Sequence, residues 1–169
     1  PLFDVGGVKF CSKCGKVAYT GHTFNARRAQ SSALYLYDVE TGETSCLVED
    51  GTYRIGNFCF DNAHGEIVFS ANPIKDGYPA PGNNLYAVSL KGGKVEAVYE
   101  GIPEELGCTT GCDVRYGGGN SMKAVDGVLY LVTSYDNTSG LCSLKRGEKK
   151  LHHITAPSFG VDFFGAGEG

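Results

Sequence analysis

The sequence repeats one pattern three times, and this repeat constrains the possible fold more than any other feature. In each copy, a segment of β-branched and aromatic residues is followed by a second such segment and then by a glycine-containing turn. The second segments begin at Leu34, Leu85 and Leu141, so the copies are spaced by 51 and 56 residues. A β-propeller blade takes about 40 to 50 residues. The spacing therefore predicts an all-β fold built from four-stranded antiparallel blades.

The composition agrees with many short strands joined by tight turns. The 169 residues are 41% hydrophobic and include 25 glycines, ten tyrosines, nine phenylalanines and no tryptophan. Glycine supplies the positive φ angles that hairpin turns need. We expect one partial propeller domain over residues 1–169, with repeats at approximately 8–50, 55–101 and 112–156 and the start of a further blade at 157–169.

About three blades and the start of another do not close a ring of about four to eight blades. We therefore expect an incomplete propeller that is a piece of a longer protein. Unpaired strand edges at the open ends would promote self-association of the isolated chain, because exposed edges can pair with other chains.

Two connecting segments stand out. Residues 21–32 and the proline-rich residues 72–84 are expected to form exposed loops at a rim of the blades. Residues 102–107 place a proline early and a glycine late, which predicts a single helical turn.

Charge and cysteine content exclude some classes of partner. The formal net charge is −4, and no long basic cluster occurs, so we expect no nucleic-acid binding. No apolar run reaches membrane-spanning length, and the first five residues lack the features of a secretion signal. Seven cysteines, an odd number, are typical of free thiols in a reducing compartment. We therefore expect a cytoplasmic protein with no membrane partner.

The cysteines leave two interpretations open. Cys11 and Cys14 have the two-residue spacing of a zinc-binding pair, and Cys108 and Cys112 could supply a second pair. The spacing of three in the second pair is less typical of zinc sites. The alternative is that all four are free cysteines at strand ends.

No other group of residues predicts catalysis. Of the four histidines, His22, His64, His152 and His153, His64 lies in an expected turn, and His152 and His153 are adjacent on an expected strand and must face opposite sides. Ser121 lacks the strand, turn and helix of a nucleophilic serine, and residues 117–119 lack a phosphate-binding motif. Asp113 and Arg115 share one face of an expected strand and are interpreted as a structural ion pair. We assign no catalytic, cofactor-binding or metal-binding residue, and expect no cofactor.

The repeat as a whole resembles a known family. The pattern of residues 62–70, 84–88, 92–94, 112–119, 127–130, 141–144 and 153–155 resembles the N-terminal β-propeller of the prolyl oligopeptidase family. It is most similar to the acylaminoacyl peptidase and dipeptidyl aminopeptidase branch. TolB-like and other binding propellers share much of the same blade pattern.

The resemblance implies a non-catalytic role for this chain. Members of that family join the propeller to an α/β-hydrolase domain, and the propeller restricts access to short peptides. A hydrolase domain beyond Gly169 would then be a partner, peptides would be substrates, and this chain would gate their access. One alternative is a stand-alone binding or scaffold propeller that recognises a protein or glycan. Another is a zinc-stabilised β-domain unrelated to propellers.

Overall fold

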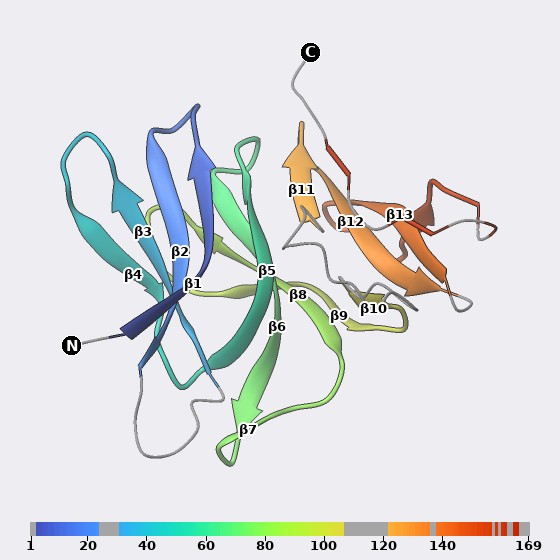
Figure 1. Cartoon of the computed structure of the whole chain (residues 1–169), viewed down its shortest axis with the longest axis horizontal. Coiled ribbons are helices and arrows are strands. Elements are labelled where there is room, and N and C mark those ends of the chain that lie inside the picture. Colours follow the sequence, from blue (N-terminus) through green and yellow to red (C-terminus); the bar gives the residue numbers. More distant parts are fainter. Residues whose placement is uncertain are drawn as a thin grey trace.

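The computed structural model describes residues 3–23, 31–106, 122–135, 138–156, 158, 160–161 and 164–165. Every regular element in these residues is a β-strand, and the strands form three antiparallel sheets. The sheets stand side by side in chain order, like the blades of a fan (Figure 1). The fold is an all-β, incomplete propeller, as the repeat predicted. Within this part of the chain, no helix is available that could cross a membrane.

The first two blades follow the same strand order. In the first, β1 (Phe3–Cys11), β2 (Lys16–Thr23), β3 (Ala33–Asp38) and β4 (Thr44–Val48) are paired in sequence. The second pairs β5 (Tyr53–Asp61), β6 (Glu66–Lys75), β8 (Asn83–Ser89) and β9 (Glu96–Ile102), and β7 (Tyr78–Pro79) also pairs with β6. Each of these two blades begins with an antiparallel hairpin, β1–β2 in the first and β5–β6 in the second.

The third blade has two short strands at its innermost position instead of one long strand. The remaining strands of this blade are β12 (Val128–Tyr135), β13 (Thr138–Lys145) and β14 (His152–His153). Two short strands, β10 (Glu105–Leu106) and β11 (Met122–Val125), pair with successive parts of β12. Asp126 and Gly127 link β11 to β12 with φ angles of 49° and 76°, as a tight hairpin requires.

Two apolar layers between the blades form the core. One layer joins the first and second blades and includes Leu34, Leu36, Phe58 and Phe69. The other joins the second and third blades and includes Val68, Leu85, Leu131 and Leu144. Successive residues of β6, such as Val68 and Phe69, lie in different layers because successive side chains of a strand face opposite sides. Each blade stabilises its neighbours by covering their apolar faces.

The innermost strands of the first two blades carry the same β-bulge. In β1 the register shifts between Val5 and Val8, and in β5 it shifts between Ile55 and Phe58. A hydroxyl of the neighbouring strand accepts a hydrogen bond from each bulge: Gly7 N–H donates to Thr20 Oγ1 at 3.0 Å, and Asn57 N–H donates to Ser70 Oγ at 2.9 Å.

The equivalent point of the third blade interrupts the strand instead. Leu106 pairs with Thr133 and Met122 pairs with Leu131, so β10 and β11 end on either side of the point opposite Val132, and the residues between them lie outside the described part of the chain. Val132 of β12 thus occupies the position that Thr20 and Ser70, whose hydroxyls accept the bulge hydrogen bonds, hold in the first two blades.

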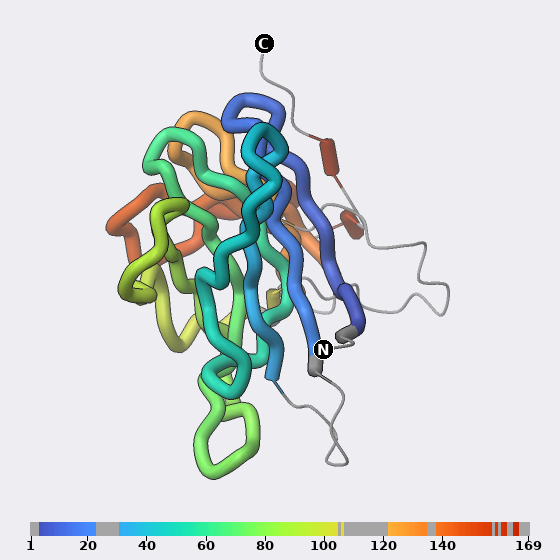
Figure 2. Tube along the Cα trace, turned by 90° about the vertical axis from the view of Figure 1, so that its left-hand side faces the viewer, coloured from blue at the N-terminus to red at the C-terminus, as the bar shows by residue number. Residues whose placement is uncertain are grey.

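Two local predictions were wrong. Residues 72–84 were expected to be a loop, but β6 continues to Lys75 and pairs with β7, because Asp76 and Gly77 adopt the positive φ angles of a tight turn. The resulting arm projects from one end of the second blade (Figures 1 and 2). The helical turn expected at 102–107 is also absent, since Glu105 and Leu106 pair with β12 as a strand.

The first blade exposes an apolar face at its innermost strand. Val5, Val8 and Phe10 of β1 are exposed, Phe10 by 63%. The residues at the same register positions of β5 are Ile55, Phe58 and Phe60, and these pack in the layer between the first and second blades. The first blade therefore presents a surface equivalent to the one with which the second blade contacts its neighbour.

Candidate functional site

A cavity lies where the innermost strands of the three blades meet. It is a groove of about 370 Å³ lined by residues of β1, β5 and β11 and of the turns that follow β1 and β5. Each of these strands is paired along one side within its sheet. We call this cavity the inner groove. Because it is built at the junction of all three blades, it exists only when the repeats stack.

Lysines provide the charged groups of the inner groove. Lys9 lies on β1, Lys123 lies on β11, and Lys13 lies in the turn between β1 and β2. Phe10 and Phe60 supply aromatic surface. Such a mixture of charged and apolar side chains can bind a small anionic molecule.

Cys11 and Cys14 lie near one end of the inner groove. The Cys11 thiol is buried and donates a hydrogen bond to Asn62 Oδ1 of the second blade at 3.2 Å. Cys14 N–H donates to Cys11 Sγ at 3.3 Å. Burial, together with the neighbouring Cys11, raises the pKa of Cys14 to about 11, so this thiol is protonated at neutral pH. Both cysteines are free.

The structure leaves the four-cysteine zinc hypothesis as a prediction. Cys108 and Cys112 lie outside the described residues, as do Asp113, Arg115, Ser121 and residues 117–119. The hydrogen bond from Cys11 to Asn62 gives the first cysteine a structural role in joining two blades.

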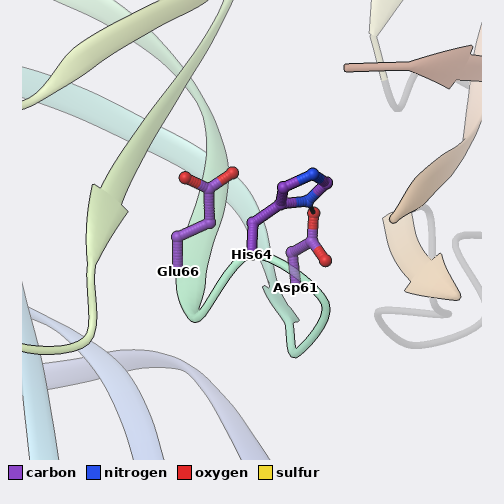
Figure 3. A group of neighbouring side chains, drawn as sticks. All are labelled: Asp61, His64 and Glu66. Carbon is purple, nitrogen blue, oxygen red and sulfur yellow. Dashed lines mark hydrogen bonds and ion pairs between the residues drawn. The ribbon is translucent and has the colours of Figure 1, made fainter. Parts of the chain in front are cut away.

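A second polar cluster lies at the turn between β5 and β6 and contains Asp61, His64 and Glu66 (Figure 3). Their potential ligand atoms lie within 4.8 Å of one another. His64 Nδ1 is 2.7 Å from Asp61 Oδ2, and Asp61 Oδ1 also accepts a hydrogen bond from the Ala63 N–H. This donor set is chemically suited to a divalent cation.

A guanidinium group already neutralises part of this cluster. Arg146, in the turn after β13, places Nη1 2.9 Å from Glu66 Oε1. Burial raises the pKa of Glu66, and Arg146 acts in the opposite direction. A metal ion at Glu66 would have to compete with this ion pair. We therefore interpret the cluster as an electrostatic contact between the second and third blades.

The ion pair predicts a pH-dependent loss of stability in Arg146→Gln. Without the guanidinium, the pKa of Glu66 in the folded state rises further above its unfolded value. The stability associated with protonated Glu66 is present at low pH and is lost as pH rises through the folded-state pKa. We expect a cost of about 1 kcal/mol at pH 7 and a smaller cost at pH 4, measured by urea unfolding.

Arg54→Gln is the matched control because Arg54 is an exposed arginine of β5. It should change stability little at either pH. An equal cost of Arg146→Gln at both pH values would contradict an electrostatic role for Arg146.

The other histidines are separated from one another as expected. His22 Nδ1 lies 3.0 Å from the Ser31 carbonyl oxygen. On β14, His152 Nε2 is 3.1 Å from Glu148 Oε2, whereas His153 Nδ1 is 3.3 Å from Cys142 Sγ. The two adjacent histidines therefore contact different partners.

Sequence reasoning missed the lysines of the inner groove. Lys9 and Lys123 occupy equivalent positions of their blades. Lys9 follows Val8 and pairs with Ala18, and Lys123 follows Met122 and pairs with Tyr130. Cys59 holds this position in the second blade. Alignment of the three repeats by strand register, rather than by their second strands, would have revealed the shared position.

Comparisons with known proteins identify the fold. No protein-family model and no curated protein matches the sequence. Among solved structures, acylaminoacyl peptidase from Pyrococcus horikoshii matches with a TM-score of 0.62 and 17% identity, over 91% of this chain and 21% of that chain. The β-propeller domain of the trilobed protease from Pyrococcus furiosus matches with a TM-score of 0.45 and 13% identity, over 87% and 54%. The chain thus spans about a fifth of the length of the first structure.

Proposed function

We propose that this chain is the non-catalytic propeller portion of a serine peptidase of the acylaminoacyl or dipeptidyl peptidase type, which gates the access of short peptides to a hydrolase domain. The observation that carries the proposal is the three-bladed arc, which superposes on acylaminoacyl peptidase over 91% of this chain. Fold similarity alone does not fix function. The sequence resemblance in the repeats adds support for a peptidase propeller.

The arm formed by β6 and β7 is the structural element best suited to restrict entry. It extends beyond the sheet at one end of the second blade, and Tyr78 at its tip is exposed. Such projecting loops carry function because they can vary without disturbing the sheets. The arm can therefore limit the size of a peptide that approaches this rim.

The first experiment is to determine the mass and C-terminal sequence of the native polypeptide. We expect a chain that continues into a hydrolase domain with a Gly-x-Ser-x-Gly motif. The native protein should then hydrolyse short peptides, whereas residues 1–169 alone should not. A native chain that contains no hydrolase domain would overturn the proposal.

The gating role needs a separate measurement on the active native protein. Replacement of residues 75–78 by two glycines should increase the kcat/KM for long peptides relative to that for short peptides. Shortening of the exposed turn at residues 91–94, on the β8–β9 hairpin, is the matched control. If both variants keep the selectivity of the native protein, the arm does not gate.

A stand-alone or scaffold propeller is the second candidate, favoured by the exposed apolar face of the first blade at Val5, Val8 and Phe10. Exposed apolar patches often mark interaction surfaces. This face could contact another blade of the same protein or a protein partner, and self-association of the isolated chain through open blade edges remains a prediction. We also propose a cytoplasmic location, which the free thiols at Cys11 and Cys14 support.

A further inference from the structure

The turn between β1 and β2 carries two cysteines that the proposed function does not use. Cys11 ends β1, Cys14 lies in the turn, and Lys16 begins β2 as the pairing partner of Cys11. A hydrogen bond joins the two thiol groups and is one of the causes that raise the pKa of Cys14. Gly15 has a φ angle of 63°, which lets the chain reverse directly after Cys14. The hairpin therefore brings both sulfurs to one place.

Backbone N–H groups of the same hairpin are directed at both sulfurs. Cys14 N–H donates to Cys11 Sγ at 3.3 Å. Lys16 N–H donates to the sulfur of Cys14 and acts to lower the pKa of that thiol. Such donors stabilise negative charge on sulfur, whereas a neutral thiol is only a weak acceptor. The turn thus supplies the hydrogen bonds that a pair of thiolates would need.

A cation is required to displace the thiol protons. Burial and the neighbouring Cys11 raise the pKa of Cys14 to about 11, because both disfavour a negative charge at this sulfur. A metal ion between the sulfurs offsets both effects, and each thiol releases its proton to solvent as its metal–sulfur bond forms. Two sulfurs that each lie ~2.3 Å from one metal ion are at most about 4.6 Å apart. This separation is compatible with the contact between Cys11 and Cys14.

The number of ligands indicates the kind of metal ion. Within the described part of the chain, Asp61, His64 and Glu66 form the one group of three or more potential ligand side chains, and neither cysteine belongs to it. Structural zinc is almost always held by four ligands, so two thiolates alone do not suit it. Thiolates are soft ligands that favour Cu(I), a monovalent ion for which two thiolates are enough. Cys11 and Ser12 line the inner groove, which gives the ion a route to the turn.

We propose that Cys11 and Cys14 form a two-thiolate site for a soft monovalent metal ion such as Cu(I). The ion replaces both thiol protons, so the occupied site carries a net charge of about −1. In the unoccupied site, the Cys11 thiol donates to Asn62 Oδ1 of the second blade at 3.2 Å. After the proton is lost, the side-chain amide of Asn62 must turn so that its N–H group donates to the sulfur. This inference does not depend on the proposed function.

The test is a competition for Cu(I) between the reduced protein and the coloured chelator bicinchoninate, without oxygen. We expect the protein to withhold one equivalent of Cu(I) from the chelator. Cys11→Ser and Cys14→Ser should each weaken binding by more than about 100-fold, because each removes one of two ligands. Cys46→Ser is the matched control, since Cys46 is an exposed free cysteine whose thiol contacts the Val48 carbonyl oxygen. This variant should bind Cu(I) as the unchanged protein does.

Alkylation by iodoacetamide gives a second readout that does not depend on affinity. Bound Cu(I) should protect Cys14 from alkylation and leave Cys46 reactive, as measured by peptide mass spectrometry. Circular dichroism of each variant confirms folding. If the buried Cys11 does not tolerate serine, Cys14→Ser still tests the site, because Cys14 is only half-buried.

Three results would overturn the proposal. Unchanged Cu(I) binding in Cys14→Ser would place the ion elsewhere. Loss of binding in the double variant Cys108→Ser, Cys112→Ser would favour the four-cysteine site over a two-thiolate site. Displacement of Cu(I) by an equal concentration of zinc would contradict the preference for a monovalent ion, because two cysteines provide only half of the four ligands that zinc prefers.

Discussion

Phe69→Ala should lower the free energy of unfolding by about 3 to 5 kcal/mol, the range for removal of a buried phenylalanine. Phe69 of β6 is 0% exposed and belongs to the apolar layer between the first and second blades. Its ring centroid lies 6.0 Å from that of Tyr53 and 5.9 Å from that of Tyr86. The substitution removes both aromatic contacts and leaves a cavity where two blades meet. Urea unfolding monitored by tyrosine fluorescence measures the loss.

Phe10→Ala is the matched control for this cavity. Phe10 is also a strand phenylalanine, but it is exposed by 63%, so its removal should cost far less. Phe69→Leu keeps most of the apolar volume and should recover much of the lost stability if Phe69→Ala is too unstable to purify. A cost for Phe69→Ala no larger than that for Phe10→Ala would show that the layer does not stabilise the chain.

Gly56→Ala should cost about 1 to 3 kcal/mol, because it overpacks the bulge of β5. A Cβ at Gly56 would lie 2.8 Å from Ser70 Oγ, the same atom that accepts the hydrogen bond of the Asn57 N–H. The hydroxyl can relieve the contact only by moving from its present position, which weakens this hydrogen bond. The same method, urea unfolding, measures the effect.

A double-mutant cycle with Ser70→Ala identifies the cause. If the clash with the hydroxyl is responsible, the double variant should cost less than the sum of the single variants. Gly160→Ala is the control, since an added Cβ there meets no atom within 4 Å. Strict additivity of Gly56→Ala and Ser70→Ala would contradict this explanation.

Much of the fold could be predicted because its signals are local. The β1–β2 and β5–β6 hairpins depend on alternating apolar residues and on tight turns. These turns contain Gly15 and Gly65, with φ angles of 63° and 66°. Local reasoning failed for residues 72–84. There the prolines suggested a loop, but the turn at Asp76 and Gly77 allows two strands to pair.

The candidate sites were harder to predict because they join distant parts of the chain. Arg146 and Glu66 are 80 residues apart in the sequence, and neither belongs to a recognisable motif. The lysines of the inner groove look like ordinary surface residues when each repeat is considered alone. Their common register position appears only after the strands of the three blades are paired.

The sequence by itself determined the repeat, the all-β class and most of the hairpins, because strand alternation and glycine turns act over a few residues. Only the tertiary structure decided which faces are buried between blades, that β10 and β11 pair with successive parts of β12, and which lysines line the inner groove. These features depend on strand register and on the stacking of one blade against the next. Such contacts form between residues that are far apart in the chain, so no local pattern specifies them.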